Sequence, residues 1–98
     1  MDGFACDMNI EGLGAVQSGK NLTLKAVIQK CGKPVEYIEL YVPLAGIRER
    51  FKKISDNEFS MEMTVPYGGR GLHVDVRFTA VASGGERSAA LEEQVVVG

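Results

Sequence analysis

The chain has 98 residues, 45% of them hydrophobic, and a formal net charge of −2. This length predicts one domain, residues 1–98, with a hydrophobic core of its own. The negative balance disfavours a nucleic-acid partner, which requires a basic surface. No hydrophobic run approaches the roughly 20 residues that span a bilayer, so membrane insertion is not expected.

Apolar and polar residues alternate along most of the chain, and this period of two predicts strands with one buried face. The clearest examples are residues 59–65 and 74–82, which are separated by Pro66 and a glycine-rich turn at 67–71. These two strands could pair with each other or lie in facing sheets. In chain order, strands are expected around residues 8–10, 22–28, 35–42, 47–54, 59–65, 74–82 and 92–97.

The segment IRERFKKI, residues 47–54, is the most highly charged of these strands. Charged side chains discourage unwanted pairing at a sheet edge, so we expect an edge strand here. Short strands with turn signals about every 8 to 12 residues are typical of a sandwich. The predicted fold class is therefore all-β, a two-sheet antiparallel sandwich of about seven strands, Ig-like or fibronectin-III-like.

Residues 34–90 resemble the second half of bacterial and archaeal immunoglobulin-like and fibronectin-III-like modules. The resemblance begins with a strand of the V-x-x-V-x-L-Y type at 35–41 and a charged strand that carries Phe51. An aromatic-led strand ending in Pro66 follows, and then a V-x-F-x-x-x-A strand after Gly71. One departure is the last hairpin, 82–86, which lacks the aspartate that such modules often carry, so no calcium-binding or capping role of that aspartate carries over.

The resemblance implies a non-catalytic accessory or interaction module, a spacer or an adhesion surface, within a longer exported or cell-surface protein. No signal peptide is visible, and the chain begins and ends close to its first and last predicted strands. We therefore expect neighbouring domains and an extracellular, periplasmic or cell-surface location, with a protein or polysaccharide partner. The alternatives are a carbohydrate-binding module of a polysaccharide-active enzyme and a cytosolic subunit of a complex.

The two cysteines, Cys6 and Cys31, are candidates for a disulfide. If Ile10 lies opposite Leu24 or Ala26 in an antiparallel pair, Cys6 falls close to Cys31. One feature does not fit this pairing: the positions expected to be buried in the preceding strand are even-numbered, whereas Cys31 is odd-numbered. Two buried, unreactive thiols are the alternative.

Two surface features could serve a partner. Tyr37 and Tyr41 are expected on the outer face of their strand, where they could form a small platform for a sugar. The basic residues of 47–54 could bind an acidic partner, or they could simply be a solvated edge. The basic patch consists of Arg48, Arg50, Lys52 and Lys53.

Catalytic and metal chemistry has little support in the sequence. A thiolate at Cys31 would need a base in contact, and nothing places His73 beside it. Met61 and Met63 share the apolar face of a predicted strand, so we expect them to fill the core rather than bind copper. We therefore expect no enzyme activity, no metal and no cofactor.

Overall fold

The computed structural model describes residues 3–98 and contains seven strands, each antiparallel to its neighbours. The strand order is β1-β2-β5-β4-β3-β6-β7. A single 3-10 turn, η1 (Leu13–Ala15), follows the first strand. The strands are β1 (Asp7–Glu11), β2 (Asn21–Gln29), β3 (Val35–Val42), β4 (Ile47–Ser55), β5 (Glu58–Thr64), β6 (His73–Ala82) and β7 (Leu91–Val96).

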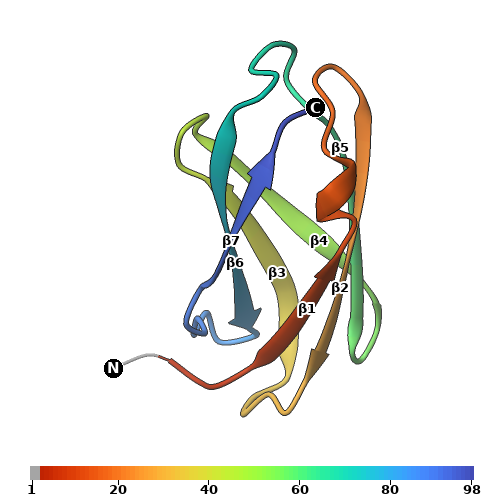
Figure 1. Cartoon of the computed structure of the whole chain (residues 1–98). Coiled ribbons are helices and arrows are strands. Elements are labelled where there is room, and N and C mark those ends of the chain that lie inside the picture. The colour runs from red at the N-terminus through yellow and green to blue at the C-terminus, as the bar shows by residue number, and fades with distance from the viewer. Residues whose placement is uncertain (1–2) are drawn as a thin grey trace.

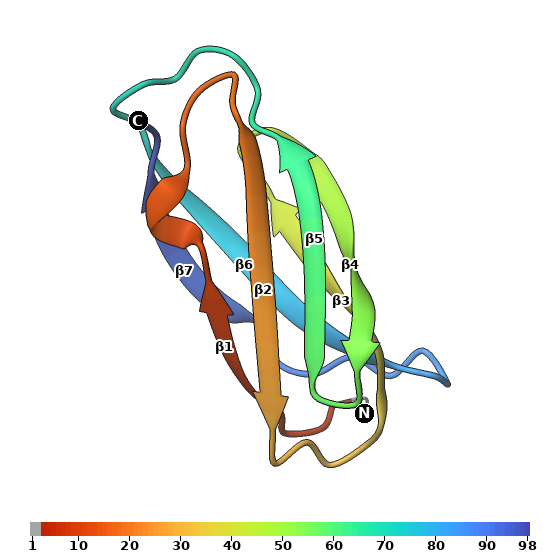
Figure 2. The ribbon, with the colours of Figure 1, turned by 90° about the vertical axis from the view of Figure 1, so that its right-hand side faces the viewer.

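The strands form two facing sheets, as the views of Figure 1 and Figure 2 show. One sheet contains β1, β2 and β5, and the other contains β3, β6 and β7. The predicted all-β, seven-stranded antiparallel sandwich is therefore confirmed. Strands β5 and β6, whose relation the sequence left open, lie in opposite sheets.

Strand β4 belongs to both sheets in turn. Its first half, residues 47–51, pairs with β3, and its second half pairs with β5 from Lys52 onward. The sequence predicted one charged edge strand, and each half does have a single partner strand. The difference is that the strand crosses from one sheet to the other, which alternation alone does not reveal.

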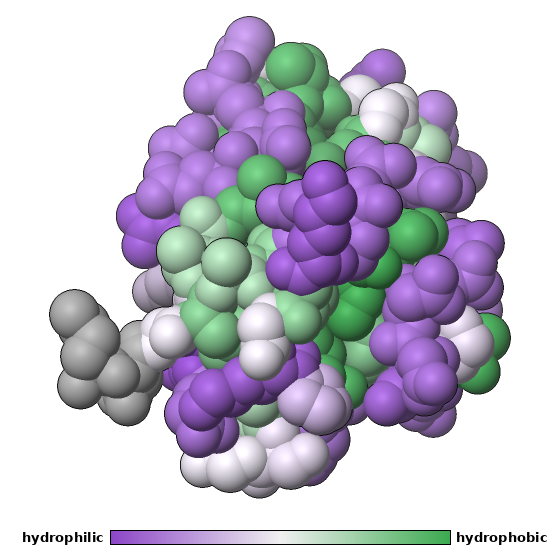
Figure 3. Space-filling model, turned by 90° about the horizontal axis from the view of Figure 1, so that it is seen from below, coloured by the Kyte–Doolittle hydropathy of each residue, from purple (hydrophilic) through white to green (hydrophobic). Residues whose placement is uncertain are grey.

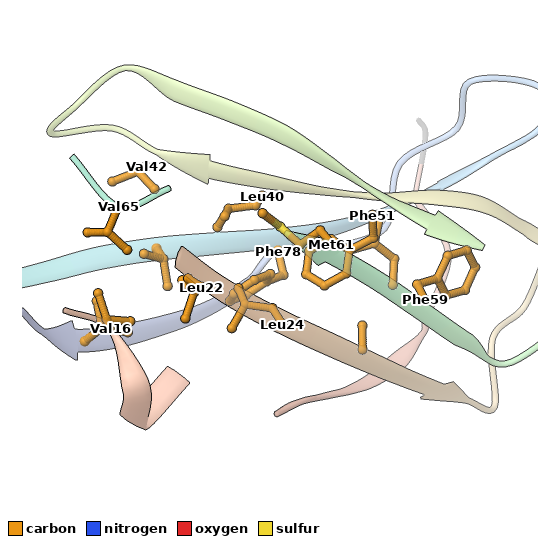
Figure 4. Close-up of a cluster of buried hydrophobic side chains, with 14 of the residues drawn as sticks. Val16, Leu22, Leu24, Leu40, Val42, Phe51, Phe59, Met61, Val65 and Phe78 are labelled. Atoms are coloured by element: carbon orange, nitrogen blue, oxygen red, sulfur yellow. The ribbon is translucent and has the colours of Figure 1, made fainter. Parts of the chain in front are cut away.

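The core lies between the sheets and follows the alternation in the sequence. Its largest fully buried side chains come from both sheets and from β4. Phe51 packs edge-to-face against Phe78, with ring centroids 6.0 Å apart, a favoured aromatic geometry. Figure 4 shows Phe51 and Phe59 at one side of the cluster, Phe78 near its middle, and Val16, Val42 and Val65 at the other side.

The two ends of the sandwich carry different loops. Residues 3–6 and the loops 30–34, 56–57 and 83–90 lie at one end, where hydrophilic residues form most of the outline (Figure 3). Loops 12–20, 43–46 and 65–72 lie at the other end with the carboxyl terminus (Figure 2). Within residues 3–98, no helix has the length and apolar character needed to cross a membrane.

Candidate functional site

An apolar cavity of about 280 Å³ lies between the two sheets at the end that carries the carboxyl terminus. Its inner wall is formed by buried residues of both sheets. Among the residues that the structure describes, no lining side chain is charged. The buried lining residues are Val16, Leu22, Leu24, Leu40, Val42, Val65, Val74, Val76, Val95 and Val97.

Side-chain size is one reason that this end is hollow. Seven of the ten buried lining residues are valines, whereas Phe51, Phe59 and Phe78 fill the other part of the core. A valine reaches a shorter distance from its strand than a phenylalanine does. The valines therefore leave space between the sheets that larger side chains fill in the rest of the core.

The path of β4 is the second reason. Its pairing with β5 reaches only as far as Lys52 opposite Ser60, and residues 47–51 follow β3 instead. Residues 61–64 of β5 consequently have β2 as their only partner strand. The two sheets separate along this line, and Ile47 and Met63 line the cavity from its two sides.

The cavity reaches the surface beside this separation. Three large hydrophobic residues of its lining are exposed: Leu44 is 70% exposed, Tyr67 93% and Leu72 49%. We call these three residues the lip. Leu44 lies in the β3–β4 loop, and the other two lie in the β5–β6 loop. The lip therefore marks the mouth of the cavity.

Hydrogen bonds hold one side of the mouth in place. Within the β5–β6 loop, the Gly68 amide donates to Ser18 Oγ at 2.6 Å, and the Gly71 amide donates to the Val97 carbonyl at 2.7 Å. The Tyr67 ring lies against Gly19, where a Cβ atom would come within 2.9 Å of the ring. Any larger residue at position 19 would therefore displace Tyr67.

The edge between the carboxyl terminus and the β1–β2 loop is closed. Beyond β7, the Gly98 amide donates to the Val16 carbonyl, and the Ser18 amide donates to the Gly98 carbonyl, both at 2.9 Å. These bonds join the end of the second sheet to the β1–β2 loop. A ligand would therefore enter between the β3–β4 and β5–β6 loops.

The candidate disulfide pair lies at the end opposite the cavity mouth, where the structure joins Cys6 and Cys31. Ile10 lies opposite Ala26, one of the two expected registers, which brings Cys6 beside the β2–β3 loop. Lys30 has a φ of 54°, in the left-handed region that non-glycine residues seldom adopt. This residue interrupts the inward–outward alternation that β2 begins, which explains why Cys31 faces Cys6 although it is out of step with the buried residues of β2.

The tyrosines proposed for sugar binding lie on the outer face of β3, and arginines of β4 cover their rings. The Arg50 guanidinium lies 4.1 Å from the Tyr37 ring centroid, and that of Arg48 lies 4.0 Å from the Tyr41 ring centroid. A sugar stacked there would have to displace these cation–π contacts. Sugar binding at this face stays a prediction, and the geometry gives it no support.

The basic patch is divided by the change of partner in β4. Arg48 and Arg50 lie in the half that pairs with β3, and Arg48 also binds Glu39 at 3.1 Å. Lys52 and Lys53 lie in the half that pairs with β5, where Lys53 is 3.8 Å from Asp56. The proposed binding of an acidic partner by all four residues stays a prediction.

The two residues weighed for catalysis lie at opposite ends of the sandwich. His73 begins β6 at the cavity end, whereas Cys31 is in the disulfide at the other end. Met61 is buried in the core, and Met63 lines the cavity. Among residues 3–98, no three His, Cys, Asp or Glu side chains are grouped to hold a metal ion.

The cavity itself was not anticipated from the sequence. One signal is present there, since valines and glycines dominate the residues near the carboxyl terminus and around 65–72. The strand directions must be known before this composition reveals that the small residues lie together at one end of the sandwich. The crossing of β4, which opens the mouth, has no comparable signal.

Comparison with known proteins bears on the fold. No protein-family model matches the chain, and the search of curated proteins finds no match. Among solved structures, the chain is similar to a Niemann-Pick type C2 protein from Japanese carpenter ant, with a TM-score of 0.58 and 10% sequence identity. The match covers 99% of this chain and 92% of the other. At this identity the likeness concerns the fold alone, an all-β sandwich consistent with an immunoglobulin-like arrangement.

Proposed function

We propose that this domain is a non-catalytic binding module of an exported or cell-surface protein, and that it holds a small apolar molecule between its two sheets. The observation that carries the proposal is the apolar cavity of about 280 Å³ with its mouth at the lip. Pockets that bind small molecules are typically concave and mainly apolar. This cavity has both properties.

The energetic argument supports an occupied cavity. A closed void of this volume would cost roughly 7 kcal/mol, at about 24 cal/mol per Å³. That is comparable with the whole stability of a typical domain, roughly 5–15 kcal/mol. The open mouth lowers the cost, because solvent fills the outer part. The buried apolar part still lacks packing partners, and an apolar ligand would supply them.

The disulfide and the sequence resemblance support the exported setting. Disulfides persist mainly in oxidising compartments outside the cytosol, and Cys6 and Cys31 are joined. We infer from the resemblance of residues 34–90 that the domain is one of the bacterial or archaeal immunoglobulin-like or fibronectin-III-like modules. In this setting the domain acts beside the other domains of a longer protein.

The cavity volume sets the size of the ligand. A cavity of about 150 Å³ holds one benzene, so this cavity suits a molecule of about ten to twelve carbon atoms. At typical binding energies per atom, the dissociation constant is expected on the order of 10 µM. Decanol matches this size and is a practical probe.

Two neighbouring residues of β7 provide the test. Val95 is buried and lines the cavity, whereas Val96 is 53% exposed and points to the opposite face. Val95→Phe fills part of the cavity, and Val96→Phe adds the same ring outside it. Decanol is titrated into the wild type and both variants, and binding is followed through the backbone amide NMR signals of the lining residues.

We expect saturable shifts for the wild type and Val96→Phe, and binding at least tenfold weaker for Val95→Phe. Equal binding by both variants, or shifts distributed over the whole surface, would overturn the proposal. A spacer or adhesion role requires no cavity, so it predicts no saturable decanol binding by any of the three proteins.

A further inference from the structure

The lip gathers exposed apolar side chains at the mouth of the cavity. Five large hydrophobic residues are exposed among residues 3–98, and three of them, Leu44, Tyr67 and Leu72, line the mouth. The other two, Ile54 and Val96, lie away from it and line no part of the cavity. Scattered exposed hydrophobic residues are normal, whereas a group around a pocket opening indicates contact with an apolar partner.

The loops at this end also differ from the rest of the chain in charge. Loops 12–20, 43–46 and 65–72 contain Lys20 and Arg70 and no acidic residue. The chain as a whole has 13 acidic and 11 basic residues. The loops at the other end contain three basic residues but also two acidic ones, Asp56 and Glu86, so the loops at the cavity end have the larger excess of positive charge.

We propose that the lip docks on the surface of an anionic lipid bilayer and that the apolar ligand enters the cavity from there. This inference rests on the proposed function, because docking would bring the cavity mouth into contact with lipid. Exposed leucines and a tyrosine beside basic residues are the side chains that proteins use at a bilayer interface. Arg70, between two glycines of the lip loop, is placed to meet lipid phosphates.

The shape of the lip favours lipid over a second copy of this chain. The three residues come from two loops beside an opening rather than from a continuous strand face. Stable dimers bury far more surface than three loop residues supply. Shallow insertion into a bilayer needs only a few apolar side chains with basic neighbours.

The experiment measures flotation with vesicles of phosphatidylcholine, with and without phosphatidylglycerol. The test variant is Leu44→Ser combined with Leu72→Ser. The control variant is Ile54→Ser combined with Val96→Ser, which removes equally large exposed side chains outside the lip. Decanol binding, followed by amide NMR, is measured on each protein as a separate readout of the cavity.

We expect wild type and control to float with anionic vesicles, more weakly at high salt, and to bind neutral vesicles less. The test variant should bind vesicles about tenfold more weakly for each leucine removed, the factor that corresponds to burying one leucine. Leu44 and Leu72 also line the cavity mouth, so the decanol affinity of the test variant should fall as well, but by much less than its vesicle binding, because the inner wall is unchanged.

Two results would overturn the lip proposal and leave the proposed function standing. The first is a wild type that binds decanol but does not float with anionic vesicles, or test and control variants that float equally. The second is self-association of the wild type, measured by sedimentation, that the test variant abolishes without any vesicle binding. A wild type that binds no decanol overturns the proposed function, and with it the uptake of ligand from the bilayer.

Discussion

The two ends of this sandwich differ in how the space between the sheets is filled. At the disulfide end, Phe51, Phe59 and Phe78 fill the space between the sheets, and a covalent bond joins β1 to the β2–β3 loop. At the other end, valines line a cavity of about 280 Å³, and hydrogen bonds rather than side chains close one edge. The comparison indicates that stability is concentrated at one end, which leaves the other free to be hollow.

Strand β4 runs from the hollow end to the filled end. Its second half completes the sheet of β1, β2 and β5 at the filled end, and its first half completes the other sheet at the hollow end. The change of partner in β4 therefore shapes both the fold and the cavity mouth. We expect substitutions at the filled end to change the free energy of unfolding without changing ligand affinity. At the hollow end, we expect substitutions to change ligand affinity with little effect on stability.

The largest effect is expected from Phe51→Ala. Phe51 is 1% exposed and contacts Phe78 edge-to-face, so truncation should lower the free energy of unfolding by about 3–5 kcal/mol. The measurement is urea denaturation of the wild type and the variant. Leu44→Ala, on the exposed lip, is the control and should change stability by no more than about 0.5 kcal/mol. A loss below about 1 kcal/mol for Phe51→Ala would show that the filled end does not hold the domain together.

Removal of the disulfide by Cys6→Ser with Cys31→Ser is the next largest effect. The bond closes a loop with a sequence separation of 25, so its loss should lower the free energy of unfolding by about 3 kcal/mol. Decanol affinity should not change, since the cavity mouth is at the other end. Urea denaturation and amide NMR give the two values. Weaker decanol binding by a variant that is still folded would mean that the two ends are coupled.

Added volume should have opposite effects at the two ends. Ala80 is fully buried and lines no part of the cavity, so Ala80→Leu should cost about 1–3 kcal/mol through overpacking. Val95→Phe extends into the cavity and should leave the melting temperature unchanged or raise it. Thermal unfolding, followed by circular dichroism, compares the two variants. Equal destabilisation would show that the cavity end has no room for a larger side chain.

Most of the fold could be predicted from alternation, because each strand has one buried and one exposed face. Alternation limited the register beside Cys6 to two choices, with Leu24 or Ala26 opposite Ile10, and the structure has Ala26 there. The crossing of β4 did not follow, because both halves of a strand alternate alike whichever sheet they join. The cavity depends on distances between sheets, which a local pattern does not contain. The left-handed backbone conformation of Lys30 could not be predicted either, because lysine rarely adopts that conformation.

The smallest effect concerns the charged surface at the filled end, where Lys33 and Glu86 join two loops. The Lys33 ammonium donates a hydrogen bond of 2.8 Å to the Glu86 carboxylate. That bond lowers the pKa of Glu86, the Glu86 backbone amide adds to the effect, and the charge of Lys33 adds further. Because the folded pKa lies below the unfolded one, the stabilisation is present above the ordinary glutamate range and is lost as the pH falls through the folded value.

Replacement of Lys33 should therefore remove this pH dependence. In Lys33→Gln, the Glu86 pKa should rise toward its ordinary value, as measured by NMR titration of its carboxyl group. Lys53→Gln removes a lysine that pairs with Asp56 at the same end and should leave the Glu86 pKa unchanged. If both replacements raise it equally, the cause is the general positive charge of this end rather than the Lys33 hydrogen bond. Decanol affinity should be the same in all three proteins, because neither lysine lines the cavity.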